Sequence, residues 1–154
     1  MPANVFISFA LENLEQVNSI RALAQNPQYG LEFHDRSELE PVKDRVGTPL
    51  PYQPDDTRAD PVRKELKRLL QKATKMVIVI GDATHKSKWV NWEIQAFYDK
   101  KSNLDGDPTK RIKGMYVKGY EDSELPKRVK KLGISTMQWD LETLNKWFNL
   151  NPNQ

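Results

Sequence analysis

One carboxylate stands out among the residues that could do chemistry. Glu93 lies in the segment KWVNWEIQAF, where Val90, Ile94 and Phe97 recur at helical spacing. At about 100° per residue these three side chains form one apolar stripe, and Glu93 lies about 60° from its centre. Trp89 precedes Glu93 by one turn on the same side. The pattern predicts a carboxylate and an indole side by side at the border of a buried helix face.

Two roles fit this position of Glu93. As a structural residue it is a boundary glutamate near the first turns of a helix, where the helix dipole favours negative charge and Trp89 provides packing. As a functional residue it is a carboxylate that can hydrogen-bond sugar hydroxyls and stabilise positive charge developing at a reacting carbon. Helical spacing is compatible with both roles.

The chain has no sequence motif for metal, nucleotide or catalytic-triad chemistry. It has no cysteine, so it forms neither a disulfide nor a thiolate metal site. No GxGxxG, P-loop, HExxH or GxSxG pattern occurs, and His34 and His85 lack a cluster of further ligands. A phosphate-receiver domain needs acidic residues after its first strand, where this chain has Ser8, Phe9 and Ala10. We expect no bound metal and no resident cofactor.

The elements that must position Glu93 alternate between strand and helix. Apolar runs predict strands at 4–9, 31–34, 76–81, 112–117 and 134–139, and helical patterns fall at 11–25, from 60 onward, at 89–101, at 125–132 and after 140. This order predicts an α/β, flavodoxin-like fold: a three-layer sandwich with a five-stranded parallel sheet. We expect one domain over residues 1–150 and a frayed tail at 151–154.

Ligands of such sheets bind outside the carboxyl ends of the strands, near the point where the strand order reverses. This rule selects residues 8–10, 34–36 and 81–87, which follow the first three predicted strands. Ser87 can either cap the next helix or help to bind an anion at its start. The long segment 37–60 contains four prolines, which is typical of a binding loop or of a disordered segment.

Charge is unevenly distributed along the chain. Residues 1–60 hold five Lys/Arg and ten Asp/Glu, whereas residues 61–154 hold nineteen and eleven. Solvated helix faces account for most charge of this kind, and no platform that combines aromatic and basic residues is apparent, so we do not expect a nucleic-acid partner. The longest apolar run, residues 76–80, is too short to span a bilayer. We therefore expect a cytoplasmic protein without membrane contact.

Three elements in their order resemble the bacterial TIR-like domains, especially the ThsB-type proteins of the Thoeris antiphage system. They are the first strand VFISF, the central strand VIVIG, and a polar turn followed by SKWVNWEI. The likeness covers residues 4–100. It implies that Glu93 is the catalytic residue of NAD cleavage, and that Phe6, Ser8 and Phe9 line the nicotinamide and ribose side of the pocket.

The resemblance has further implications for the site and its partners. The loop that begins at Asp35 is similar to a family loop that covers the site or packs on a neighbouring subunit. NAD would be the substrate, a homo-oligomer would complete the site, and a separate effector protein would respond to the product. We expect Asp35, Arg36, Asp82, Ser87 and Trp89 among the residues that contact NAD, with Lys86 and Lys88 as further candidates for the phosphates.

The implied reaction suits a site with one carboxylate. Cleavage of the bond between ribose and nicotinamide passes through an oxocarbenium-like state and releases a neutral leaving group. Exclusion of water favours capture by an internal nucleophile, which gives a cyclic or conjugated ADP-ribose. Two alternatives stay open: a non-catalytic interaction module in which Glu93 is structural, and an enzyme similar to nucleoside deoxyribosyltransferases, in which the glutamate is a nucleophile.

Overall fold

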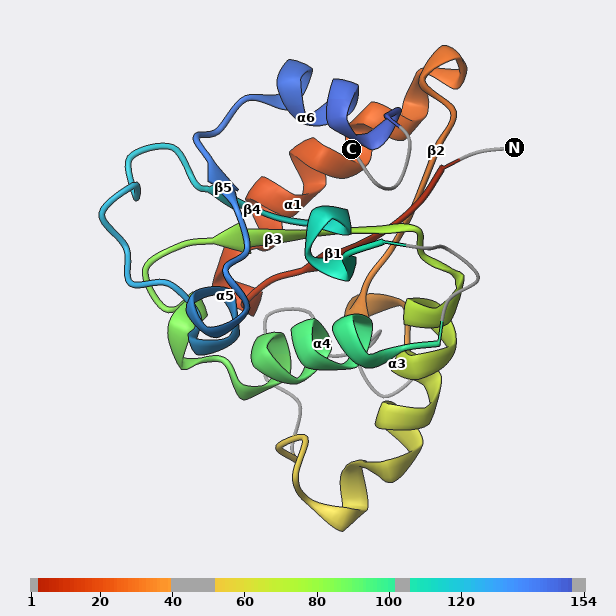
Figure 1. The fold of residues 1–154 in the computed structure, drawn as a ribbon, viewed down its shortest axis with the longest axis vertical. Coiled ribbons are helices and arrows are strands. Elements are labelled where there is room, and N and C mark those ends of the chain that lie inside the picture. Colours follow the sequence, from red (N-terminus) through yellow and green to blue (C-terminus); the bar gives the residue numbers. More distant parts are fainter. Residues whose placement is uncertain (1–2, 40–51, 102–105, 151–154) are drawn as a thin grey trace.

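A parallel sheet forms the middle layer of the protein (Figure 1). The computed structural model describes residues 3–39, 52–101 and 106–150. The strands are β1 (Ala3–Ser8), β2 (Leu31–His34), β3 (Lys75–Ile80), β4 (Ile112–Tyr116) and β5 (Thr136–Met137), in the order β2-β1-β3-β4-β5. Every neighbouring pair of strands is parallel. The predicted α/β fold with a five-stranded parallel sheet is confirmed.

Helices cover both faces of this sheet, which makes the expected three layers (Figure 1). One face carries α1 (Leu14–Arg21) and α6 (Leu141–Phe148), and the other carries α3 (Asp60–Lys72), α4 (Lys88–Asp99) and α5 (Lys127–Leu132). Short 3-10 turns connect them: η1 (Leu11–Asn13), η2 (Ala22–Gln25), η3 (Pro27–Tyr29), η4 (Arg36–Glu38), η5 (Thr57–Ala59), η6 (Thr84–Lys86) and η7 (Pro108–Arg111).

Strand β3 is buried over its whole length because both helical layers pack on it. Successive side chains of a strand point to opposite faces. Ile78 and Ile80 accordingly join the core under α3 and α4, and Val77 and Val79 join the core under α1 and α6. The uninterrupted apolar run that predicted a central strand is explained by this double coverage.

A lysine at the start of β3 is also buried. Lys75 is 1% exposed, and its Nζ donates hydrogen bonds to the carbonyl oxygens of Trp147 and Leu150. Burial, with a smaller effect of Lys113, lowers the pKa of Lys75 to about 8. The last carbonyls of α6 have no partner within their own helix, so Lys75 ties this helix end to the sheet.

Two predicted elements differ from the structure in more than their end residues. The fifth strand was expected over 134–139 but pairs with β4 only through Thr136 and Met137. Its predicted beginning instead closes α5, because Gly133 adopts a left-handed conformation and the Ile134 amide donates to the Val129 carbonyl. The helix expected over 11–25 is divided into η1, α1 and η2.

Part of the predicted proline-rich loop has regular structure. Within 37–60, η4 occupies the first residues and η5 the last, while residues 40–51 lie outside the described part of the chain. The predicted tail at 151–154 also lies outside it. None of the helices in the described ranges is long and apolar enough to cross a bilayer.

Candidate functional site

The strand order reverses between β1 and β3, and three polar side chains meet beside this point. Ser8 is the last residue of β1 and lies opposite Ile78 of β3 in the sheet. Arg36 belongs to η4, directly after β2, and Glu93 belongs to α4, which follows β3. Crevices at such reversals are the usual ligand sites of parallel sheets. The topology thus brings Ser8 and Arg36, from two of the three predicted segments, beside Glu93, which lies beyond the third segment in α4.

Glu93 is the centre of this cluster. The Ser8 hydroxyl donates a hydrogen bond of 2.6 Å to Oε1 of Glu93, and Nη1 of Arg36 lies 3.0 Å from Oε2. The second contact is an ion pair without hydrogen-bond alignment. Glu93 was predicted at the border of the buried face, but it is 0% exposed. The end of β1 and the η4 turn cover it, which helical spacing alone does not reveal.

Burial controls the ionisation of this carboxyl group. It raises the pKa of Glu93 to about 7, while the Arg36 charge and the Ser8 hydrogen bond act in the opposite direction. The nearby Asp35 carboxylate adds to the rise. A carboxyl group with this pKa exchanges its proton near neutral pH, which is the property that general acids and bases need. Strongly perturbed groups of this kind mark candidate functional sites.

Arg36 links the carboxylate to the end of β1. Its Nη2 donates a hydrogen bond of 2.8 Å to the Phe9 carbonyl oxygen, and the residue is 6% exposed. The guanidinium presents several donors in a fixed plane, so one residue can contact both groups. Arg36 was expected to meet a phosphate. In this structure it instead neutralises Glu93, and its contact with phosphate remains a prediction.

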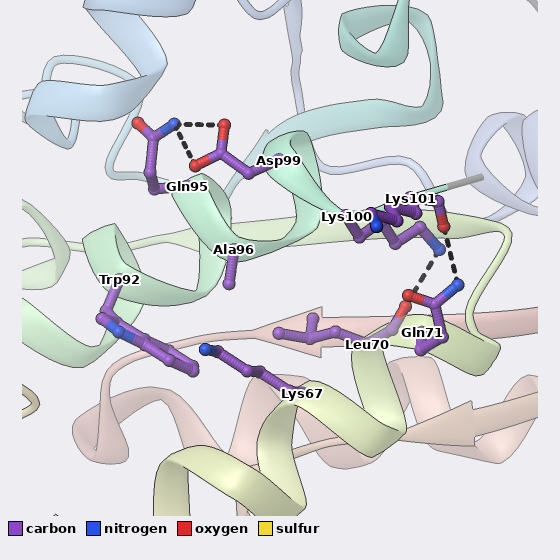
Figure 2. Close-up of a pocket in the computed structure, with 9 residues that line it drawn as sticks. All are labelled: Lys67, Leu70, Gln71, Trp92, Gln95, Ala96, Asp99, Lys100 and Lys101. Carbon is purple, nitrogen blue, oxygen red and sulfur yellow. Dashed lines mark hydrogen bonds between the residues drawn. The ribbon is translucent and has the colours of Figure 1, made fainter.

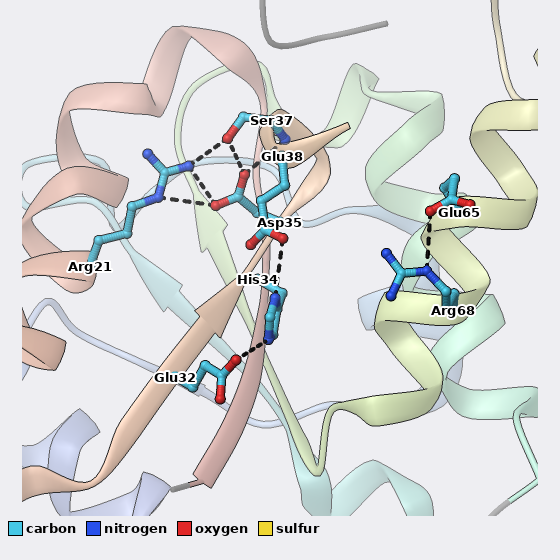
Figure 3. Close-up of polar contacts among 8 residues, drawn as sticks. All are labelled: Arg21, Glu32, His34, Asp35, Ser37, Glu38, Glu65 and Arg68. Carbon is cyan, nitrogen blue, oxygen red and sulfur yellow. Dashed lines mark hydrogen bonds and ion pairs between the residues drawn. The ribbon is translucent and has the colours of Figure 1, made fainter. Parts of the chain in front are cut away.

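A second polar network holds the η4 turn in place (Figure 3). Arg21 of α1 contacts Oδ2 of Asp35 through Nη2 at 2.5 Å and Nε at 3.0 Å. The other carboxylate oxygen of Asp35 accepts hydrogen bonds from the Ser37 amide, at 2.8 Å, and from the Ser37 hydroxyl. Asp35 therefore caps η4, and this cap fixes the direction in which Arg36 leaves the turn. Sequence reasoning missed Arg21, because helical spacing gives no sign of a contact with a separate strand end.

The histidine next to this network has a separate set of partners (Figure 3). His34 lies 3.2 Å from Glu32 and 3.1 Å from Glu38, and both carboxylates are exposed. Over residues 3–39, 52–101 and 106–150, no group of three or more histidine, aspartate or glutamate side chains is arranged to hold a metal ion.

The aromatic residues expected around a nicotinamide lie on both faces of the sheet. Phe6 and Trp89 belong to the core under α3 and α4, whereas Phe9 belongs to the core under α1 and α6. The indole nitrogen of Trp89 donates a 3.1 Å hydrogen bond to the Tyr52 carbonyl, and its ring packs edge to face on Trp92. The contacts of these rings with a substrate remain predictions.

The start of α4 shows which of the two expected roles Ser87 has in this structure. Its hydroxyl accepts a 3.2 Å hydrogen bond from the Val90 amide, so Ser87 caps the helix. Asp82, Lys86 and Lys88 are exposed. No hydrogen bond or ion pair joins Asp82 to Glu93 within the described ranges. Three of the predicted residues, Ser8, Arg36 and Glu93, thus form the cluster, and the contact of Asp82 with NAD remains a prediction.

The backbone of Gly81, directly after β3, lies very close to the side chain of Asn13. A Cβ on Gly81 would lie 2.6 Å from both Nδ2 and Oδ1 of Asn13, so only glycine leaves room for this amide. Asn13 is 7% exposed, and its Oδ1 has no hydrogen-bond partner among the described residues. Asn13 was not among the predicted site residues.

Comparison with known protein families identifies a match that covers this cluster. Residues 6–113 match the family described as Thoeris protein ThsB, TIR-like domain. The matched range extends from β1 into β4 and includes Ser8, Arg36 and Glu93. No curated protein matches the chain.

Proposed function

Because the chain belongs to the TIR-like domain family of the Thoeris protein ThsB, we propose that it is an NAD-cleaving enzyme with Glu93 as its catalytic residue. It releases nicotinamide and produces a cyclic or conjugated ADP-ribose signal in antiphage defence. One observation carries the proposal: a fully buried carboxyl group with its pKa raised to about 7 lies beside the reversal of strand order. NAD is the substrate and not a resident cofactor.

The reaction needs one carboxylate that stabilises positive charge. The bond between the ribose anomeric carbon and the nicotinamide nitrogen breaks, and its electron pair leaves with the neutral nicotinamide. The ionised Glu93 stabilises the resulting oxocarbenium-like centre and accepts hydrogen bonds from the ribose hydroxyls. A ring nitrogen of the adenine then forms the new bond to the anomeric carbon, and water in the same position gives ADP-ribose and a proton.

Substrate binding requires a rearrangement around Glu93. In the described arrangement Ser8 and Arg36 occupy its two oxygens, and the side chain is 0% exposed. The ribose hydroxyls have to replace one of these partners. Arg36 is the partner that can change places, because its charge can be satisfied by the NAD pyrophosphate once it leaves Glu93. Arg36 would then pair with Glu93 in the free protein and with the pyrophosphate when NAD is bound.

Neighbouring subunits and a responding protein belong to the same proposal. A homo-oligomer would supply the groups that complete the NAD pocket, and a separate effector would bind the nucleotide product. We also propose, on the basis of the family resemblance, that NAD contacts Phe6, Phe9, Asp82, Ser87 and Trp89. We propose a cytoplasmic location, where NAD is available.

The burial of Glu93 and its two polar contacts also fit the alternative function, a non-catalytic interaction module. A glutamate with both oxygens occupied and no exposed surface is what a purely structural residue of an interaction module would show. In that case the Ser8–Glu93–Arg36 cluster would only join α4 to the ends of β1 and β2. Replacing the carboxylate would then change stability and leave any partner binding intact.

Nicotinamide release separates the two functions. The wild-type protein is incubated with NAD at increasing protein concentration, and products are resolved by chromatography. We expect nicotinamide and an ADP-ribose derivative from the wild type, and a loss of at least about 100-fold in rate in Glu93→Gln, because a neutral amide cannot stabilise the cationic centre. Absence of nicotinamide from assembled protein, or full activity in the variant, would exclude the proposal.

A matched variant shows that the effect belongs to the site. Glu65 lies on the exposed side of α3, where it contacts Arg68 at 3.1 Å (Figure 3). Glu65→Gln makes the same chemical change away from Glu93, and we expect wild-type activity from it. Circular dichroism of both variants checks that the fold is retained.

A further inference from the structure

A basic groove runs along the outer side of α3 and α4, on the same helix as Glu93 but on its opposite side. It consists of two adjoining hollows of about 580 Å³ and about 640 Å³. The first is shown in Figure 2, and Lys67, Trp92 and Gln95 line both hollows. Sites for small molecules commonly have volumes of about 300–1,000 Å³. Neither hollow is lined by Ser8, Arg36 or Glu93.

The larger hollow gathers cationic side chains from three helices. Arg63 and Lys67 come from α3, Lys88 from α4, and Arg128 from α5, whereas Asp55 is the one carboxylate in its lining. These residues are far apart in the sequence. Their convergence is therefore a product of the fold, and it gathers four of the nineteen Lys/Arg of residues 61–154 around one hollow.

Three of these cations have no counter-charge in the described part of the chain. The side chains of Lys67, Lys88 and Arg128 make no hydrogen bond or ion pair with the described residues. Arg63, by contrast, is held by the Pro54 and Asp56 carbonyl oxygens, both at 2.6 Å. Unpaired cations around one concave surface repel each other and attract a multivalent anion. The hollow thus has the electrostatic character of a polyphosphate site.

The walls of the groove are held rigidly enough to preserve this arrangement. Oδ1 of Asn91 accepts a 3.0 Å hydrogen bond from the backbone amide of Arg128, which fixes the start of α5 against α4. Arg63 fixes the rim at Pro54 by the bond described above. A site whose backbone walls are already positioned loses less conformational entropy when an anion binds.

Trp92 supplies a flat apolar surface beside the cations. It is partly buried, and it lines both hollows. Its ring packs edge to face on Trp89 with centroids 5.8 Å apart, so its orientation is fixed from within the core. An indole in this setting can stack on a nucleobase. One aromatic ring at a compact cluster of cations suits a single base, whereas a nucleic-acid strand needs a line of such rings.

From this geometry we infer that the α3–α4 groove is a second binding site, which takes a nucleoside polyphosphate. The phosphates contact Lys67, Lys88 and Arg128, and the base stacks on Trp92. The site is separate from the Glu93 cluster and needs no bond cleavage. Its occupancy can influence the cluster, because Trp92 and Glu93 are adjacent residues of α4.

Titration calorimetry with ATP tests this site, because ATP contains no nicotinamide bond and its binding does not depend on NAD cleavage. We expect saturable binding that weakens as salt is added. Lys67→Ala combined with Arg128→Ala weakens binding by at least about tenfold, since each removes a charge-assisted contact. Lys72→Ala is the matched control, because Lys72 is exposed on α3 but does not line the groove. Its affinity should equal that of the wild type.

Simpler probes separate the two parts of the ligand. Inorganic triphosphate should bind more tightly than adenosine, and Trp92→Leu should weaken binding of ATP but not of triphosphate. Absence of saturable binding would overturn the inference. The same conclusion would follow if the double variant kept wild-type affinity, if Arg36→Ala rather than the groove variants abolished ATP binding, or if a single-stranded oligonucleotide bound more tightly than ATP.

Discussion

Titration of Glu93 should make the protein less stable as the pH rises from 5 to 7. Burial raises the pKa of this carboxyl group from its ordinary value of 4.5 to about 7. Between these two values the folded state binds more protons than the unfolded state, so the free energy of unfolding falls with increasing pH. The stabilising contribution of the protonated form is complete below pH 4.5 and is lost as the pH passes through about 7.

The size of the effect follows from the two pKa values. Each unit of difference corresponds to about 1.4 kcal/mol. Between pH 5 and pH 8 the contribution of Glu93 should fall by about 2–3 kcal/mol, most of it below pH 7, and the curve should level off above about pH 7.5. The full penalty for ionising the buried group is about 3–4 kcal/mol.

Urea denaturation followed by tryptophan fluorescence measures this contribution. The free energy of unfolding is determined from pH 5 to pH 8.5 for the wild type and for Glu93→Gln, and the difference between the two is plotted against pH. Subtraction removes the groups that titrate alike in both proteins. Glu65→Gln, which changes an exposed glutamate of α3, should follow the wild-type curve.

Two outcomes would refute the reasoning. A flat difference between pH 5 and pH 8 would mean that Glu93 is not desolvated in the folded protein. A difference that rises with pH would mean that attraction to Arg36, at 3.0 Å, outweighs the cost of burial. Either result would also remove the perturbed pKa from the argument for catalysis.

Three further variants probe neighbouring features. Arg36→Ala removes the largest influence that lowers the pKa of Glu93, so the carboxyl ¹³C resonance of Glu93 should titrate at higher pH than in the wild type; an unchanged titration would contradict the ion pair. Ser87→Ala removes the cap of α4 and should cost about 1 kcal/mol in urea denaturation, whereas Ser87→Asp should retain most of the stability. Gly114→Ala places a methyl group 2.7 Å from Cδ1 of Ile80 and should cost about 1–3 kcal/mol, and thermal unfolding at the wild-type temperature would show that the Ile80 side chain or β4 can shift to make room.

The sequence was informative about the elements because their signals are local. Alternation and apolar runs predicted strands β1 to β4, and β2 was placed at its observed residues. The bounds predicted for the fifth strand were wrong. Only two residues of β5 pair with β4, which is too few to produce a clear periodicity, and the left-handed Gly133 ends α5 close to this strand. Asp140 caps α6 by accepting a 3.0 Å hydrogen bond from the Thr143 amide, a local signal because it depends on residues three apart.

The candidate site was predictable only as a region. The rule for parallel sheets selected the ends of β1, β2 and β3, which do supply Ser8 and Arg36 beside Glu93. It also selected Asp82, whose side chain is exposed. The support from Arg21 was not visible, since side chains from α1 and from the end of β2 meet only when the sheet is assembled.

By itself, then, the sequence determined the α/β class, the strands that end at the site and the glutamate at its centre, because each depends on patterns within a few residues. Only the tertiary structure decided that Glu93 is fully buried and that its oxygens contact Ser8 and Arg36. Ser8 and Glu93 are 85 residues apart, and no local periodicity encodes their contact. The burial of Glu93 and its ion pair arise from the crossover connections that carry α4 back over the sheet. They set the pKa of Glu93, on which the proposed chemistry depends.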